Sequence, residues 1–402
     1  MEADFGSLVR LYERRIKNTN LDFVRADIDS IPWNDRMIGI KGARGVGKTT
    51  LLLQHIKRDI KNTDEALYVT LDNLYFYEHN LFELAEEFML MGGKYLFVDE
   101  VHKYPKWTVE LKMIYDELPE LKVVFTGSSI LQMLKGQADL SRRALIYDLN
   151  GLTFREYLIF NQNLSATETF SLDDIRNNHK EIALSITNQI KPIVHFKKYL
   201  EYGFFPFYKE NESSYHQRLA QVINMVIDTD LVSIHDINIE TVHKLKQLLF
   251  VIAGSVPFKP NITKLSEHIK ASRNTVLMLI NYLKDAQLIA PLYASGGGDN
   301  ILRKPEKIYL GNTNLIYAIN AANMNEGNER ETFFMQQLSR NHTVNSSPKG
   351  DFMIDNEYLF EVGGKNKNLS QLKGETNGYV AADMIEVGYG RIIPLWLFGF
   401  LE

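Results

Sequence analysis

The sequence has no cysteine among its 402 residues. This absence excludes a disulfide framework, a thiolate nucleophile, an iron–sulfur cluster and any zinc site built on cysteine. Long apolar runs are also lacking, and the most apolar stretch, residues 392–401, is too short to cross a bilayer. The N-terminus has early acidic residues and no apolar core of signal-peptide length. We therefore expect a soluble, cytoplasmic protein with no membrane partner.

Low-complexity sequence is absent too, since 25 Gly and 11 Pro are ordinary numbers for a globular chain. The length predicts two or three domains. The net charge of −5 is unevenly distributed, because residues 241–310 hold ten Lys and Arg against four Asp and Glu. Such a basic segment in an acidic protein marks either a polyanion-binding surface or a surface that docks against acidic parts of the same chain.

Short apolar runs alternate with helical stretches between residues 36 and 149. The runs have the length and composition of buried strands and read MIGIKG, ALYVTLD, KYLFVDE, LKVVFTGS and ALIYDL. Strands that alternate with helices predict an α/β fold with a parallel sheet and helices on both faces. We expect an amphipathic helix before this region, at residues 5–16, and mostly helical structure after it.

A glycine-rich loop follows the first of these strands, and its sequence GARGVGKT fits the pattern G-x-x-x-x-G-K-[ST]. Its glycines allow the backbone to wrap phosphates, and the N-terminus of the next helix adds N–H donors and partial positive charge. Lys48 is expected to reach the β- and γ-phosphates, and the Thr49 hydroxyl to ligate Mg²⁺. The predicted phosphate-binding residues are Gly42, Ala43, Arg44, Gly45, Val46, Gly47, Lys48, Thr49 and Thr50.

Two acids end a second buried strand, where such a fold places its metal and base. We expect Asp99 to hold Mg²⁺ and Glu100 to polarise the attacking water. A carboxylate beside the metal aspartate is typical of water-activating ATPases, and no guanine-reading N-K-x-D segment is present. The sequence therefore favours ATP with Mg²⁺ as the bound nucleotide.

A third strand ends in Thr126-Gly127-Ser128. Either Thr126 or Ser128 can sense the γ-phosphate or the water, and the sequence does not choose between them. Arg142 and Arg143 precede the next strand, where one of them can neutralise transition-state charge within the chain or in a neighbouring subunit, or both can be surface residues.

These motifs together resemble those of a known family. The runs that carry the resemblance are KYLFVDEVHKYPKW (94–107), VVFTGSS (123–129), LSRRA (140–144), GLTFREYL (151–158) and EYGFFP (201–206). They are similar to those of prokaryotic AAA-type ATPases whose C-terminal region is known as domain of unknown function 4143. The resemblance implies phosphate, metal and base roles for Lys48, Thr49, Asp99 and Glu100, and it matches Arg143 to an arginine of the family.

The resemblance also implies the order of the domains. An α/β P-loop NTPase core is followed by a helical linker, a winged helix and a small α+β domain resembling restriction endonucleases. The expected segments are an N-terminal helical segment (1–35), the ATPase domain (36–150), the linker (151–240), the winged helix (241–320) and the endonuclease-like domain (321–402).

The basic segment contains a helix-turn-helix pattern at residues 261–292, and Ser272 can cap its second helix. A glycine-rich turn at residues 296–299 and a returning strand then form a basic wing carrying Arg303, Lys304 and Lys307.

The second helix of this pattern leaves DNA binding open. Outward positions that suit DNA contacts are Arg273, Asn274, Asn281 and Lys284. Two apolar residues, Leu277 and Met278, also lie off the main apolar face, which favours packing on another domain. Both interpretations remain.

Two strands near residues 350–362 predict a hairpin in which Asp351 faces Glu361. Opposed residues have Cβ atoms about 5 Å apart, which is close enough to share a divalent metal. Active endonuclease-like sites usually carry a lysine where this sequence has Gly363. Lys365 can reach in only if the strand continues, and Glu329 can supply a third ligand. The alternative is a fold kept for packing or partner binding.

The sequence thus predicts a Mg²⁺-dependent ATPase whose nucleotide state controls its C-terminal modules. Two other functions remain open: an ATP-gated nuclease that processes DNA, and a slow nucleotide switch that recruits a protein partner. The oligomeric state is also open.

Overall fold

The structure, a computed structural model, describes residues 4–127, 140–165, 168–254, 257–296, 303–323 and 325–402. Ser128 and the centre of the predicted wing turn therefore lie outside the described residues. The chain divides into two compact units, Met1–Gly151 and Leu152–Glu402. The finer division into five segments stays a prediction.

The N-terminal unit contains a five-stranded sheet in which every neighbouring pair is parallel. Its strands are β1 (Met37–Lys41), β2 (Ala66–Thr70), β3 (Tyr95–Asp99), β4 (Lys122–Gly127) and β5 (Leu145–Asp148), in the spatial order β2-β3-β4-β1-β5. The first four strands are almost continuously buried, as a parallel sheet covered on both faces requires. The predicted α/β fold class is confirmed.

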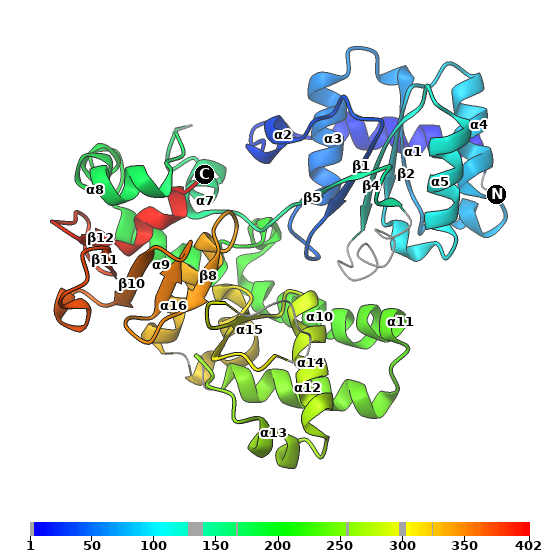
Figure 1. The fold of residues 1–402 in the computed structure, drawn as a ribbon. Helices are drawn as coiled ribbons and strands as arrows, with labels where there is room; N and C mark the ends of the chain where they lie inside the picture. The colour runs from blue at the N-terminus through cyan, green and yellow to red at the C-terminus, as the bar shows by residue number, and fades with distance from the viewer. Residues whose placement is uncertain (1–3, 128–139, 166–167, 255–256, 297–302, 324) are drawn as a thin grey trace. The chain divides into compact units, whose positions relative to one another are not determined.

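The helices of this unit are α1 (Phe5–Asn18), α2 (Asp27–Ser30), α3 (Lys48–Asp59), α4 (Leu81–Leu90) and α5 (Trp107–Glu117). Figure 1 shows α3 on one side of the sheet and α4 and α5 on the other. The Asp4 side chain caps α1, which buries Leu8 and Tyr12 and packs on β2 and α3. The predicted helix at residues 5–16 therefore exists, and it belongs to the N-terminal unit.

The second unit is mostly helical in its first part. The helices among its described residues are α7 (Phe154–Phe160), α8 (Leu172–Thr187), α9 (Pro192–Tyr202), α10 (Tyr215–Met225), α11 (Val232–His235), α12 (Ile239–Ala253), α13 (Ile262–His268), α14 (Arg273–Asp285), α15 (Thr313–Asn320) and α16 (Glu326–Leu338). A capping box starts α7, since Thr153 and Glu156 bond each other's backbone N–H. No helix among the described residues combines the length and the apolar character that a membrane span needs.

The basic segment forms helices followed by a hairpin. Helices α12, α13 and α14 precede the antiparallel pair β6 (Ile289–Leu292) and β7 (Lys307–Leu310), and an isolated bridge joins Phe258 to Ile308. The Ser272 hydroxyl accepts from the Thr275 N–H at 3.1 Å and caps α14, as the sequence predicts.

A second sheet closes the chain. Its strands are β8 (Val344–Ser346), β9 (Phe352–Ile354), β10 (Tyr358–Gly363), β11 (Gly378–Ala382) and β12 (Ile392–Pro394), in the order β12-β11-β10-β9-β8. Strands β8 to β10 are antiparallel, and β10 to β12 are parallel. Phe352 pairs with Phe360, which is the register that the predicted Asp351–Glu361 hairpin requires. The Phe334 ring of α16 packs against both of these aromatic residues.

Candidate nucleotide-binding site

The loop between β1 and α3 has the backbone that the glycine pattern predicts. Gly45 and Gly47 have φ angles of 84° and 99°, in the left-handed region that favours glycine. A Cβ atom at Gly42 would lie 2.2 Å from the carbonyl oxygen of Leu149, so this position has no room for a side chain. The loop then enters α3 at Lys48, where the helix N-terminus supplies N–H donors. This geometry fits a phosphate group.

The Lys48 side chain is folded onto its own loop. Its Nζ atom donates to the carbonyl oxygens of Gly42 at 2.7 Å and Ala43 at 3.0 Å, and the residue is buried. Buried ammonium groups need such acceptors, because leaving the charge unsatisfied is costly. The predicted phosphate-binding lysine is therefore held within the loop.

The Asp99 carboxylate is the centre of a cluster of hydroxyl groups. The Thr49 Oγ1 atom lies 2.6 Å from Asp99 Oδ2, and the Tyr68 hydroxyl donates to the same oxygen at 2.7 Å. The Thr126 hydroxyl donates to Oδ1. Asp99 is only 2% exposed, and burial together with its negative charge raises the pKa of Tyr68. Sheet order explains the cluster, because β4 lies between β1 and β3 and brings Thr126 to the same edge.

The oxygen atoms of this cluster suit a magnesium ion as ligands. Mg²⁺ prefers oxygen ligands, and the structure brings together the Thr49 hydroxyl and the Asp99 carboxylate, which the sequence predicts as its ligands. Both groups stand beside the phosphate-binding loop. The residues present therefore fit Mg²⁺ bound with a nucleotide.

Glu100 has a left-handed backbone with φ 55°, which turns the chain sharply after β3. Its Oε2 atom lies 3.3 Å from His102 Nε2, and the Arg44 Nη2 atom lies 3.4 Å from the same nitrogen. The His102 side chain is 3% exposed. His102, to which the sequence assigned no functional role, thus lies between the loop and the predicted base.

Arg143 lies away from this edge of the sheet. It forms a two-pronged ion pair with Asp116, with both N–O distances at 2.9 Å. Residue 143 precedes β5, which is parallel to β1, so it lies at the amino edge of the sheet while the loop lies at the carboxyl edge. The predicted action of Arg143 within its own chain does not agree with this placement.

The sequence analysis did not identify Arg25, which is buried next to the loop. Its guanidinium donates to the carbonyl oxygens of Val46 in the loop at 3.4 Å, Asn150 at 2.5 Å and Gly151 at 3.4 Å. It also pairs with Asp27. Arg25 therefore ties the phosphate loop to the segment in which the N-terminal unit ends.

The predicted acid pair of the C-terminal sheet has lysine partners. Asp351 accepts from Lys307 Nζ at 3.1 Å and from the Val362 N–H at 3.0 Å, while Glu361 Oε1 lies 2.5 Å from Lys367 Nζ. The sequence analysis considered Lys365 for the lysine near Glu361, and the structure brings Lys367 there instead.

A third acid joins Asp351, but it is not the predicted Glu329. Glu331 accepts from Lys307 at 3.2 Å and from the Tyr309 hydroxyl at 2.6 Å, whereas Glu329 accepts from the Tyr317 hydroxyl at 2.6 Å. Residues two apart on a helix project in very different directions, which explains the exchange. Among the described residues, no group of three or more His, Asp or Glu side chains is arranged to hold a metal ion.

Several residues of the predicted DNA-binding surface are engaged inside the second unit. Lys307 is paired as above, and Arg303 donates to the carbonyl of Ala294 and lies over the Tyr293 ring. Leu277 of α14 is buried, while Arg273 and Lys284 remain exposed. The buried residues favour the packing interpretation for much of this segment.

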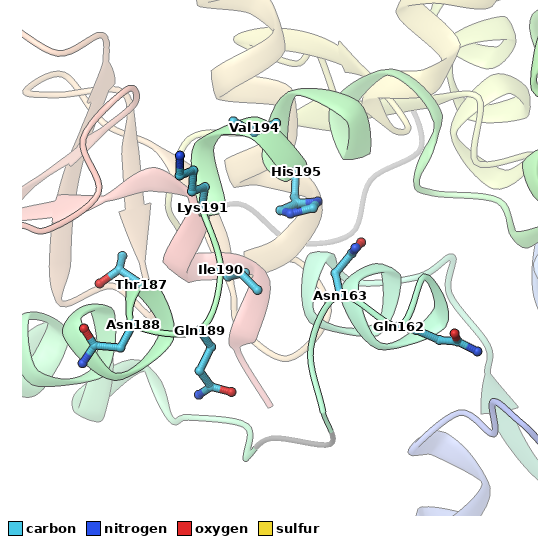
Figure 2. Close-up of a pocket in the computed structure, with 9 residues that line it drawn as sticks. All are labelled: Gln162, Asn163, Thr187, Asn188, Gln189, Ile190, Lys191, Val194 and His195. Atoms are coloured by element: carbon cyan, nitrogen blue, oxygen red, sulfur yellow. The ribbon is translucent and has the colours of Figure 1, made fainter.

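A cavity of about 620 Å³ lies elsewhere in the second unit. Figure 2 shows its lining side chains, which come from the turn after α7, the end of α8 and its connection to α9, and the start of α9. The lining has no carboxylate, and burial with the nearby Lys198 lowers the pKa of His195. The described residues of this lining therefore offer no carboxylate for acid–base catalysis.

Comparisons with known proteins agree with the geometry of the N-terminal unit. Residues 34–158 match the family model described as AAA domain, and residues 193–326 match a domain of unknown function, 8612, which differs from the predicted domain 4143. Uncharacterized protein MJ1637 of Methanocaldococcus jannaschii is 28% identical over 312 residues, which make up 74% of this chain and 65% of that protein. The chain thus spans about 65% of the length of this relative.

Two solved structures are similar at lower identity. The Walker-type ATPase PABY2304 of Pyrococcus abyssi is 13% identical with a TM-score of 0.41, over 74% of this chain and 95% of that chain. AMPPCP-bound DnaA from Aquifex aeolicus is 15% identical with a TM-score of 0.28, over 70% of this chain and 89% of that chain. The AAA domain match includes the phosphate loop, Asp99 and Thr126, which the structure assembles at one sheet edge, so residues 34–158 are similar to an AAA domain in both sequence and site geometry.

Proposed function

We propose that the chain is a Mg²⁺-dependent ATPase whose nucleotide state controls its C-terminal modules. The observation that carries the proposal is the direct contact of 2.6 Å between the Thr49 hydroxyl and the Asp99 carboxylate, next to the glycine-rich loop. This contact joins the phosphate-binding and metal-binding elements of one site. The sequence favours adenine over guanine, because no guanine-reading motif is present.

Each residue of the site has its own role in ATP hydrolysis. The loop N–H groups and Lys48 bind the phosphates, and Lys48 exchanges its carbonyl acceptors for phosphate oxygens when ATP enters. Bound Mg²⁺ neutralises charge that develops on the phosphates. Glu100 orients the attacking water and takes its proton, and Thr126 or Ser128 senses the γ-phosphate. His102 keeps the Glu100 carboxylate in place by its 3.3 Å contact.

Arg143 enters the proposal only as a residue that acts on a neighbouring subunit. Its ion pair with Asp116 is surface-accessible, since the two side chains are 26% and 38% exposed. An exposed ion pair contributes little stability, so exchange for a partner site costs little. Oligomerisation is the condition for this role.

For the C-terminal modules we propose a winged helix followed by an endonuclease-like domain that binds a partner and does not cleave DNA. The ion pair of Asp351 with Lys307 supports this choice over the ATP-gated nuclease, because a cation already lies 3.1 Å from this carboxylate. The second candidate is a nucleotide switch that recruits a protein. Lys307 already pairs with Asp351, and Arg303 already donates to the Ala294 carbonyl, which favours a protein partner over DNA.

The Lys48→Ala substitution tests the proposal. We expect it to abolish binding of the fluorescent analogue MANT-ATP and phosphate release, because the loop loses the lysine that is proposed to bind the phosphates. Lys61→Ala, which changes an exposed lysine after the same helix, serves as the matched control and should leave both unchanged. If the parent chain binds no MANT-ATP in the presence of Mg²⁺, the proposal is wrong.

A further inference from the structure

Tyr68 lies in the edge strand β2, next to β3, and is 3% exposed. Its hydroxyl donates to Asp99 Oδ2 at 2.7 Å, the oxygen that also accepts from Thr49. Phenylalanine would fill this position equally well, and a buried hydroxyl is costly unless it is bonded. The hydrogen bond that the hydroxyl donates to the Asp99 carboxylate therefore explains why a tyrosine stands here.

The phenol is in turn held by Arg15 of α1. The Arg15 Nη1 atom donates to the Tyr68 hydroxyl oxygen at 3.1 Å, and the guanidinium lies over the Tyr68 ring at 5.1 Å from its centroid. Arginine has no acceptor, so the hydrogen bonds run in one direction, from Arg15 to Tyr68 and from Tyr68 to Asp99. The cation at the start of this series makes the phenol a better donor.

Helix α1 is placed so that this series can form. It packs on β2, which carries Tyr68, and on α3, which carries Thr49. It ends at Asn18, before the AAA domain match begins at residue 34. The helix is therefore an addition to the matched domain that reaches its metal-binding carboxylate through Tyr68.

We infer that Tyr68 is a positioning residue for Asp99 and that α1, through Arg15, is part of the nucleotide–metal site. This inference rests on the proposed function. Outer partners that orient a metal ligand typically change metal affinity or activity by 10- to 100-fold when they are removed. Tyr68 holds the Asp99 carboxylate in its orientation beside the Thr49 hydroxyl, and these two groups would hold Mg²⁺.

The test is a titration of Mg²⁺ with MANT-ATP fluorescence as the readout, which reports binding independently of turnover. We expect Tyr68→Phe to raise the Mg²⁺ concentration at half-saturation by about tenfold or more. Affinity measured in EDTA should change by less than about twofold, because Tyr68 acts on the metal ligand and not on the phosphates. The matched control is Tyr12→Phe, since Tyr12 is equally buried and its hydroxyl donates to the Thr63 carbonyl at 2.8 Å.

Arg15→Gln provides a second variant at an exposed residue, where folding is little affected. It should shift the Mg²⁺ titration in the same direction by a smaller factor. Combined with Tyr68→Phe it should add nothing further, because Arg15 acts only through Tyr68.

Two results overturn the inference. In the first, the parent binds MANT-ATP and Tyr68→Phe follows the parental Mg²⁺ titration, which refutes the role of Tyr68 and leaves the proposed function intact. In the second, Tyr12→Phe shifts the titration as much as Tyr68→Phe, which makes the effect one of general packing. A parent chain that binds no MANT-ATP refutes the proposed function and this inference together.

Discussion

The guanidinium of Arg25 donates to the carbonyl oxygen of Asn150 at 2.5 Å. The same side chain reaches the Val46 carbonyl of the phosphate loop at 3.4 Å, and it is 5% exposed. A buried arginine thus joins two segments that are more than a hundred residues apart in the chain. This one side chain therefore connects the phosphate loop to the last residues of the unit.

Removal of this link should destabilise the N-terminal unit. Arg25→Met keeps much of the side-chain volume but leaves the carbonyls of Val46 and Asn150 without this donor, and Asp27 without its cation. We expect a loss of about 3 kcal/mol in the free energy of unfolding, which is typical when one partner of a buried charged network is removed.

Urea denaturation followed by tryptophan fluorescence measures this loss, since Trp33 and Trp107 belong to the N-terminal unit. Arg10→Met is the control, because Arg10 forms only an exposed ion pair with Asp4 and should change stability by less than about 0.5 kcal/mol. Equal transitions for both variants would show that Arg25 does not stabilise the unit.

The sequence predicts the parts of the site that depend on local spacing. The loop, the two acids after β3 and Thr126 each follow a buried strand of a parallel sheet, so their common edge follows from topology. The facing of Asp351 and Glu361 was predictable for the same reason, because a tight hairpin sets its own register.

Other residues depend on contacts between distant segments. Tyr68 looks like any strand aromatic, and only the neighbouring positions of β2 and β3 bring its hydroxyl to Asp99. Lys307 was predicted as a basic residue of the wing, but β7 places it against Glu331 of α16 and against Asp351. Arg25 lies in no motif at all. A single sequence carries no signal for such pairings.

Lys307 occupies a place between Glu331 and Asp351 that a divalent cation would otherwise suit. Burial lowers the pKa of Lys307, but the two nearby carboxylates outweigh this effect and raise the pKa. The side chain therefore stays charged. Lys307→Met leaves two acids close together without their cation, so we expect the variant to melt at a lower temperature and to be stabilised by Mn²⁺. The parent chain without nucleotide should not respond to Mn²⁺.

The melting temperature with and without Mn²⁺ checks this prediction, and Lys304→Met, at an exposed neighbouring lysine, is its control. Stabilisation of the parent by Mn²⁺ that is lost in Asp351→Ala would contradict it and would favour the nuclease alternative.

Glu329 makes stability depend on pH. Burial raises its pKa from 4.5 to about 7, and the nearby Asp383 adds to the shift, while Tyr317 and Arg330 oppose it. Since the folded state holds the proton more tightly than the unfolded state, the free energy of unfolding should fall as the pH rises from about 4.5 to about 7. Above pH 7 the penalty for this group is up to about 3 kcal/mol.

Glu329→Gln keeps the acceptor for the Tyr317 hydroxyl and removes the charge. The variant should therefore be more stable than the parent at pH 8 and nearly equal to it at pH 4.5, in urea denaturation at the two pH values. A parent and variant that differ by the same amount at both pH values would show that Glu329 does not titrate in this range.

The measurement that tests the central claim most directly is steady-state phosphate release with Mg²⁺ and ATP, for the parent and for Glu100→Gln, with MANT-ATP binding measured in parallel. Glu100 is assigned as the base, so we expect the variant to keep nucleotide affinity and to lose at least about a hundredfold in turnover. Equal turnover in the two proteins, or the absence of adenine nucleotide binding in the parent, would contradict the account.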